Sequence, residues 1–235
     1  MSVPMVKNKP TLEEKRDIAR KAILDVSMEL FYEKGFEKTT TRDIITKAGI
    51  LNGSLYNRFK NKDEILACII NEALAAVLKK CSTILEAERN LLLASVFPGA
   101  LEIYASSRFP HLASLLYEVH RKWSTISMYL EINKGWRLAF SEYFGVPPMD
   151  PELANLKIIS SAGSVGNIVG YYADGGTLDV RLAIREHAVQ VATMMGVPTI
   201  DLEALVDRLI HIIENSEIIF LGHDLRRELD GKFND

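Results

Sequence analysis

The sequence predicts an all-α protein, with an N-terminal three-helix domain of the helix-turn-helix type before a larger helical domain. Apolar residues recur at three- and four-residue steps along most of the 235-residue chain, and Gly, Pro and capping residues divide these stretches. No run alternates with period two for long enough to indicate a sheet. We therefore expect a flexible arm over 1–10, a helix-turn-helix domain over 11–62 and a helical domain over 63–235.

The first helix is expected to begin at a capping box formed by Thr11 and Glu14 and to end at Gly35. Its apolar residues fall at helical spacing: Ile18, Ala22, Ile23, Val26, Leu30 and Phe31. The arm before it, with Lys7 and Lys9, could reach a phosphate backbone or could equally be a solvated tail.

Two short helices joined by a glycine turn are predicted next. Thr40 can cap the first of them, with Asp43 completing a capping box. Gly49 supplies the positive φ that a sharp turn requires. Leu55 and Phe59 then repeat at helical spacing on the second helix. A helix-turn-helix places its second helix in the major groove of DNA.

The remaining helices are predicted from the same pattern of Gly, Pro and capping residues. We expect a long helix from Asn61 to about Glu88 and a shorter one from Leu91 to Ser106. Further helices are predicted over 111–120, 123–144, 151–173, 179–195 and 201–221.

The segment from Leu30 to Leu66 resembles the N-terminal domain of the tetracycline-repressor (TetR) family of bacterial transcription regulators. The matching elements are Phe31, Gly35-Phe36, Thr39-Thr40, Ile44-Ile45, the run from Ala48 to Phe59, and the run from Lys62 to Leu66. Leu51 departs from the pattern, since a Ser or Thr normally caps the recognition helix there, and Arg58 replaces the usual ring. The resemblance implies a homodimeric DNA-binding repressor that a small molecule controls.

The resemblance also implies which residues contact a double-stranded DNA operator. Short polar groups on the second helix could reach base edges, and the others could hold phosphates. The expected contacts are Thr40, Thr41, Arg42, Asn52, Gly53, Ser54, Tyr56, Asn57, Arg58 and Lys62. A solvated polar face is the alternative for any one of them.

The charge distribution fits a protein that touches nucleic acid with one end. The formal net charge is −3, yet residues 1–70 hold 13 Lys and Arg against 10 Asp and Glu, while the rest holds 15 against 21. No apolar run approaches the length of a membrane helix, and the first ten residues do not resemble a secretion signal. Cys68 and Cys81 have no pairing or metal-type spacing. We expect a soluble, cytoplasmic protein with two free thiols.

Dimerisation would have to come from the C-terminal domain. The 151–174 helix carries a stripe of small residues, Ser160, Gly163, Asn167 and Gly170, that would let another helix approach closely. The last long helix is the second candidate, with Leu205, Leu209, Ile212, Ile213, Ile219 and Phe220. Either stripe could instead pack within one subunit.

Aromatic residues between 97 and 144 indicate a site for an apolar or aromatic small molecule. Such sites are largely apolar, with a few converging polar groups. The expected lining is Phe97, Tyr104, Tyr117, His120, Trp123, Tyr129, Asn133, Trp136 and Phe140. Ordinary core packing is the alternative for this stripe.

Enzyme readings find little support. The five histidines form no HExxH motif or Cys/His cluster, and Gly163-Ser164-Val165-Gly166 does not fit a nucleophile elbow. Glu186-His187 and Glu214 look like exposed-helix patterns. We expect no catalytic residues, no metal and no cofactor. A ligand-independent regulator, an activator and, much less favoured, a helical enzyme remain as alternatives to the ligand-controlled repressor.

Overall fold

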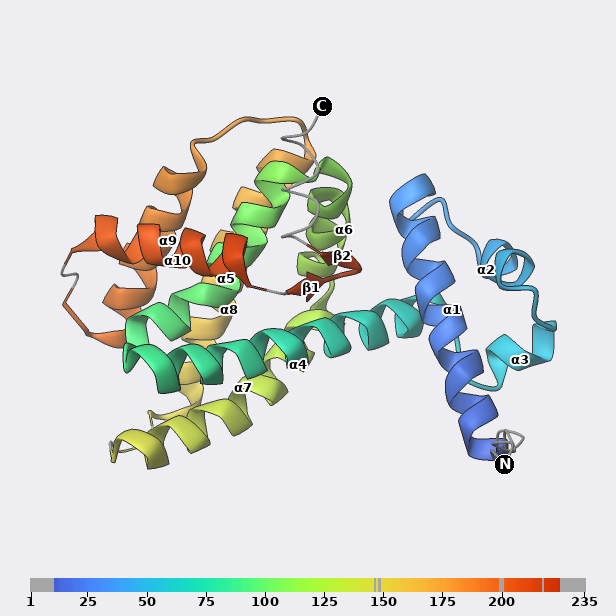
Figure 1. Cartoon of the computed structure of the whole chain (residues 1–235), viewed down its shortest axis with the longest axis horizontal. Coiled ribbons are helices and arrows are strands. Elements are labelled where there is room, and N and C mark those ends of the chain that lie inside the picture. The colour runs from blue at the N-terminus through green and yellow to red at the C-terminus, as the bar shows by residue number, and fades with distance from the viewer. Residues whose placement is uncertain (1–10, 146, 148, 199–200, 217, 225–235) are drawn as a thin grey trace, which may run out of the picture. The chain divides into compact units, whose positions relative to one another are not determined.

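The computed structural model describes residues 11–145, 147, 149–198, 201–216 and 218–224 (Figure 1). The described residues form ten α-helices and one two-stranded hairpin, which confirms the predicted all-α class. The chain divides into two compact units, up to Cys68 and from Ile69 onward. The predicted arm over 1–10 lies outside the described residues.

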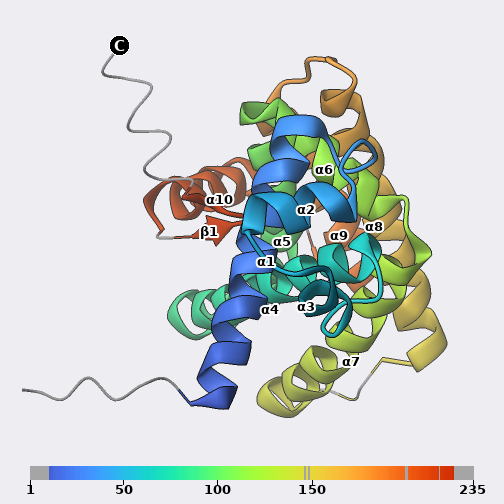
Figure 2. The same ribbon diagram turned by 90° about the vertical axis from the view of Figure 1, so that its right-hand side faces the viewer.

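The first unit contains α1 (Leu12–Lys34), α2 (Thr41–Ala48), α3 (Asn52–Tyr56) and the start of α4 (Lys62–Glu88). Figure 2 shows α2 and α3 following one another along the chain beside α1. Their shared core consists of fully or almost fully buried apolar residues: Ile23, Leu30, Phe31, Phe36, Ile44, Leu55, Phe59 and Ile65. Burial of these side chains is the main stabilising contribution to so small a domain.

Local chemistry sets the bounds of α2. The Thr40 side chain accepts from the Asp43 amide, the Asp43 carboxylate accepts from the Thr40 amide, and Gly49 ends the helix at φ 63°. The predicted capping box and glycine turn are therefore confirmed. Burial of Ile44 and Leu55, at 0% exposure, holds α2 and α3 against the rest of the unit.

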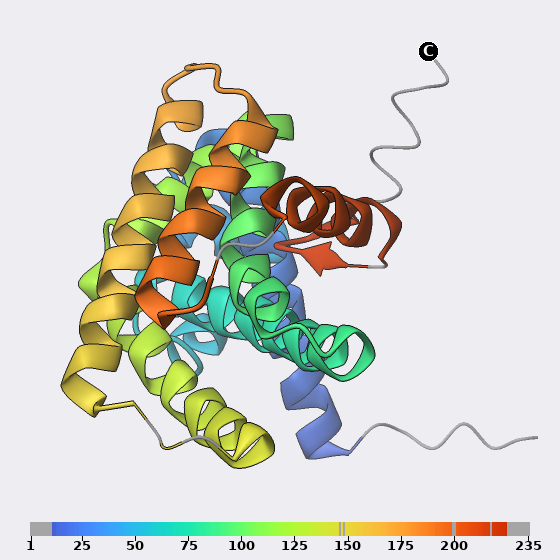
Figure 3. The same cartoon turned by 90° about the vertical axis from the view of Figure 1, so that its left-hand side faces the viewer.

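The second unit contains the rest of α4 with α5 (Leu91–Arg108), α6 (Pro110–His120), α7 (Trp123–Phe144), α8 (Pro151–Ala173), α9 (Val180–Met195) and α10 (Leu202–Asn215). α8 and α9 run side by side, with α5 packed against both (Figure 3). Two glycines of α8 allow α6 to come close. A Cβ on Gly166 would lie 2.9 Å from His120, and a Cβ on Gly170 would lie 2.6 Å from the Tyr117 ring.

The last predicted helix is too long. α10 ends at Asn215, well before residue 221, and the chain then forms a hairpin of β1 (Ile219–Phe220) and β2 (His223–Asp224). Leu221 and Gly222 both have positive φ, 49° and 84°, as the two central residues of a tight hairpin turn require. The apolar period of α10 continues into the hairpin, which is why the sequence pattern overran the helix end.

None of the helices in the described part of the chain has the length and apolar character needed to cross a lipid bilayer.

Candidate nucleic-acid interface and internal cavity

The short helix α3 is held by one side and presents the other to solvent. Leu55 is fully buried, whereas Asn52, Gly53, Tyr56 and Asn57 are exposed. The buried leucine fixes the rotation of the helix about its axis. Polar groups able to donate and accept hydrogen bonds therefore face outward from a fixed support.

Tyr56 is tied to the start of α2. Its hydroxyl lies 3.1 Å from the Thr41 hydroxyl, while 52% of the side chain stays exposed. This bond joins the two helices at their outer surface. Arg42, the next residue of α2, is also exposed, so the predicted phosphate-contacting groups Thr41, Arg42 and Tyr56 belong to one surface region.

Three of the side chains that were predicted to contact DNA already form hydrogen bonds within the helix-turn-helix unit. Arg58 Nη1 donates to the Ser54 carbonyl at 2.7 Å, and the Thr40 hydroxyl is engaged in the capping box. Lys62 Nζ donates to the carbonyls of Phe36 and Glu37 at 2.8 and 3.0 Å and lies 4.3 Å from the centre of the Phe36 ring. These side chains would have to exchange or share their partners to touch a phosphate.

Leu51 occupies the N-cap of α3 without a capping side chain, and it is 81% exposed. The first amides of α3 therefore lack the side-chain acceptor that a Ser or Thr would give. Helix N-termini with such amides attract phosphate oxygens.

The orientation of α2 is reinforced by ion pairs to α1. Lys34 bonds the Asp43 carboxylate at 3.0 Å, and Lys47 contacts Glu33 at 2.8 Å and Glu29 at 3.2 Å. Hydrogen bonds from the Thr40 backbone amide and then from Lys34 lower the pKa of Asp43 to about 2. The capping carboxylate is thus ionised throughout the neutral range.

The second unit contains a partly open cavity of about 540 Å³, within the size range of small-molecule sites. Its wall is mostly apolar and comes from α4, α5, α7, α8 and α9, with contributions from the end of α6 and the connecting segments. The apolar wall includes Leu74, Leu78, Leu91, Ala94, Pro98, Ile158, Val165, Val191, Met194 and Met195.

Three of the nine residues predicted to bind a ligand, His120, Tyr129 and Asn133, line this cavity. The other described ones lie elsewhere: Phe97 and Tyr104 are buried in the core, Tyr117 packs on Gly170, and Trp123 is 64% exposed. The side chains of Trp136 and Phe140 lie outside what the structure describes.

A buried hydrogen bond between a histidine and a glutamate forms part of the cavity wall. His120 Nε2 lies 2.6 Å from Glu102 Oε2, with side-chain exposures of 5% and 14%. Burial lowers the pKa of His120, but the charge and hydrogen bond of Glu102 outweigh it, so the pKa is raised overall. The pKa of the buried Tyr129 hydroxyl is raised well above 10, by burial first and by Glu102 second.

His187 is a second buried histidine, for which the sequence indicated only an exposed-helix pattern. It is 2% exposed, in contrast to the predicted exposed-helix pattern, because it faces α5 and packs on Gly99. Burial lowers its pKa to about 4, and Nδ1 has no hydrogen-bond partner. Glu214, also predicted to be exposed, is only partly so and accepts a 2.5 Å hydrogen bond from the Tyr104 hydroxyl.

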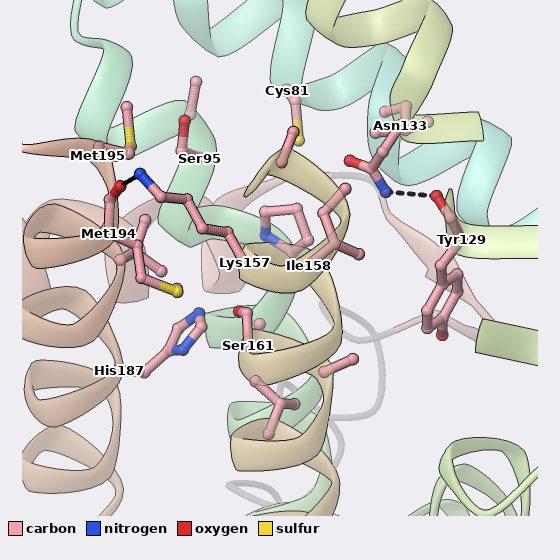
Figure 4. A pocket seen from close by; sticks show the side chains of 18 of the residues that line it. Cys81, Ser95, Tyr129, Asn133, Lys157, Ile158, Ser161, His187, Met194 and Met195 are labelled. Atoms are coloured by element: carbon pink, nitrogen blue, oxygen red, sulfur yellow. Dashed lines mark hydrogen bonds between the residues drawn. The ribbon is translucent and has the colours of Figure 1, made fainter. Parts of the chain in front are cut away.

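Lys157 crosses from α8 to the end of α9. Figure 4 shows its extended side chain, with the ammonium at the Met194 carbonyl and with Ser161 and His187 nearby on the same wall. Glu102, Lys157 and His187 thus form a polar set that the aromatic pattern could not indicate. Only a weak sequence feature marks these three residues as a site: each is a polar residue within a largely apolar helix face.

The two predicted dimer helices differ in what they leave uncovered. On α8, Ser160, Gly163 and Asn167 are exposed and lie between Leu156 and Tyr171, which are 56% and 51% exposed. On α10, by contrast, Leu205, Leu209, Ile212 and Ile213 are all at most 7% exposed; of the two residues of that stripe that lie in β1, Phe220 is 4% and Ile219 68% exposed. The α10 stripe therefore packs within its own subunit, and α8 retains an unpartnered apolar face.

The exposed polar α3 beside a capped α2 defines a helix-turn-helix protein whose second, helical unit contains a ligand-sized cavity. The family description "Bacterial regulatory proteins, tetR family" matches residues 23–69, which contain α2, α3 and the first turns of α4. Residues 23–69 are therefore similar to the N-terminal, DNA-binding part of regulators of the TetR family.

Similar proteins agree with this assignment. Over 57 residues the chain is 46% identical to the HTH-type transcriptional repressor KstR2 of Rhodococcus jostii, an alignment that spans 23% of this chain and 28% of that protein. It is 24% identical over 142 residues to the HTH-type transcriptional repressor Rv3405c of Mycobacterium tuberculosis, spanning 52% of this chain and 74% of that one. The match to KstR2 therefore covers less than a third of the relative's length.

A putative TetR-family regulator from Syntrophomonas wolfei shares the fold beyond the first unit. Its crystal structure superposes with a TM-score of 0.54 and 19% identity, covering 79% of this chain and 99% of the other.

Proposed function

We propose that the protein is a homodimeric, sequence-specific DNA-binding repressor that is released from its operator by a small molecule, and that it is not an enzyme. The exposed polar face of α3, fixed by the buried Leu55, is the observation that carries the proposal. A rigid helix with outward amide and hydroxyl groups is what major-groove recognition needs. The repressor names of the relatives support the same assignment.

Sequence reading is assigned to Asn52 and Asn57, with Ser54 as a smaller contributor. An asparagine amide donates and accepts at once, so it can bond the N6 and N7 edge of adenine. Gly53 lets the backbone approach the groove. Thr41, Arg42 and Tyr56 would hold phosphates and so fix the register of α3 on the duplex.

The exposed face of α8 supports the dimer. Leu156, Ile159 and Tyr171 leave apolar surface around Gly163, where another backbone can come close. Two copies would present two α3 helices to successive major grooves, about 34–36 Å apart for one turn of DNA or at multiples of that spacing. The DNA contacts of the two α3 helices add together, so a dimer binds its operator more tightly than one short helix could.

Ligand control is assigned to α4, which is continuous from one unit to the other. Its first turns belong to the helix-turn-helix unit, and Leu74, Leu78 and Cys81 from its later turns line the cavity. A ligand that binds one arrangement of this helix more tightly shifts the population toward it. Operator affinity then falls by the same coupling factor with which DNA weakens ligand binding.

The test is selection of bound fragments from random DNA, followed by anisotropy titrations on the selected site. Asn57→Ala should weaken binding by about 5- to 150-fold and relax the preference at one base pair. Asn71→Ala, an exposed asparagine on α4 outside the proposed interface, is the matched control and should bind like the wild type. Affinity should also fall steeply with salt. Recovery of no common sequence, or equal effects of the two substitutions, would contradict the proposed DNA-reading role.

A further inference from the structure

Lys157 is a cation in the wall of a mainly apolar cavity. Its ammonium donates to the Met194 carbonyl in the last turn of α9, and no carboxylate among the described residues forms an ion pair with it. A lysine ammonium carries three donors. One is used by that carbonyl, so two others are available to a ligand or to solvent.

The charges of the cavity wall do not cancel. Glu102 is its sole acidic residue among the described ones, and it is already paired with His120 at 2.6 Å. That hydrogen bond engages the Glu102 carboxylate on the side of the cavity formed by α5 and α6. Lys157 is thus a partly buried cation on a mostly apolar wall with no carboxylate of the described wall beside it, and an acidic group of a ligand could pair with it there.

His187 supplies an acceptor rather than a second charge. Its pKa of about 4 leaves the ring neutral at pH 7, and its Nδ1 has no partner although the side chain is 2% exposed. A buried acceptor of this kind calls for a hydrogen-bond donor, which a water molecule bound in the cavity can supply. Ser161, one turn after Lys157 on α8, lies on the same wall (Figure 4).

We infer that the effector is an amphipathic carboxylic acid, with its carboxylate bound by Lys157 and its apolar body packed along the leucine, isoleucine and methionine wall. The inference rests on the proposed function, since it takes this cavity to be the effector site. A neutral ligand would leave the Lys157 charge uncompensated. A cationic one would be repelled.

The experiment compares three ten-carbon probes, decanoate, 1-decanol and decylamine, by isothermal titration with the full-length protein in the absence of DNA. Decanoate should bind at least tenfold tighter than 1-decanol, and decylamine weakest of all. Lys157→Met keeps the apolar stem and removes the charge, so decanoate should lose about 10- to 100-fold in affinity, the size expected for a charged hydrogen bond. Binding of 1-decanol should change less than decanoate binding does.

Lys79→Met is the matched control, because it makes the same change in net charge at an exposed position of α4 outside the cavity. Lys157→Arg, which keeps the charge, should keep the preference for decanoate even if Lys157→Met destabilises the fold. Equal binding of decanoate and 1-decanol, or equal losses in the Lys157→Met and Lys79→Met variants, would overturn the inference.

The two proposals fail separately. If the protein selects no DNA sequence, the proposed function is lost, while the probe titrations still decide the ligand class. If neutral compounds release the protein from its DNA site and decanoate binds no tighter than 1-decanol, the repressor stands and the carboxylate inference falls.

Discussion

Protonation of His187 should couple the stability of the second unit to pH. The side chain is 2% exposed and lies against Gly99, where a Cβ would meet Nε2 at 2.2 Å. Burial lowers the pKa from 6.5 to about 4, partly opposed by Glu102 and by a hydrogen bond with the Val96 backbone. The neutral ring is therefore the form that the folded protein accepts.

The direction of the pH effect on stability follows from the number of protons that the folded and unfolded states bind. Between pH 6.5 and about 4 the unfolded chain protonates this histidine and the folded protein does not, so stability falls as the pH falls. The whole difference corresponds to about 3 kcal/mol, of which about 2 kcal/mol is lost by pH 5. His120 has the opposite sign, because its pKa is raised: its contribution is present below pH 6.5 and lost as the pH rises.

The assay is urea denaturation of the wild type and His187→Leu, followed by circular dichroism at one protein concentration and at pH 7.5, 6 and 5. The loss of unfolding free energy from neutral pH to pH 5 should be smaller in the variant by about 2 kcal/mol. His120 is present in both proteins, so its effect cancels in this difference to first order. His111→Leu, at an exposed position of α6, should follow the wild type. Parallel pH profiles for the wild type and His187→Leu would refute the reasoning.

Two further predictions concern packing, and each has a control variant at an exposed position. Leu55→Ala should destabilise the helix-turn-helix unit by about 2–5 kcal/mol, since Leu55 is fully buried, whereas Leu51→Ala, 81% exposed, should change the unfolding midpoint little. Gly170→Ala should cost about 1–3 kcal/mol, because its Cβ would lie 2.6 Å from Tyr117. Gly135→Ala, at an exposed position of α7 outside the proposed dimer surface, meets nothing within 4 Å and should stabilise that helix by about 0.5–1 kcal/mol. Thermal melts measure both pairs, and similar losses within either pair would contradict the packing assigned to it.

Local signals were sufficient to predict most of the helices. α7 and α8 span 123–144 and 151–173 as expected, because Gly145 takes the left-handed conformation after α7 and Asp150 caps α8 before Pro151. The predicted end of the last helix, at residue 221, was wrong because no capping residue marks the end of α10 at Asn215. The apolar spacing runs on to Ile219 and Phe220, while the hairpin turn at Leu221–Gly222 depends on backbone angles that no cap residue announces.

The cavity could be predicted only in part. His120, Tyr129 and Asn133 were found because they lie on or beside one aromatic stripe of consecutive helices. Glu102, Lys157 and His187 come from α5, α8 and α9, and they share a cavity only because those helices pack together. Spacing within one helix carries no information about the helix opposite. Phe97 and Tyr104 show the same limit: both are aromatic, and both are turned into the core between α5 and its neighbours.

The difference between the surroundings of Gly163 and Gly170 bears on the proposed dimer. They are seven residues apart, so an α-helix places them on nearly the same side, and the sequence assigns them to one stripe. The structure separates them by what lies opposite. Tyr117 of α6 covers Gly170, whereas nothing lies within 4 Å of a Cβ on Gly163. The small-residue stripe therefore has two environments: at one end it lets α6 approach within the subunit, and at the other it leaves an exposed apolar surface, bordered by Leu156 and Ile159, which is the surface we propose for a second copy.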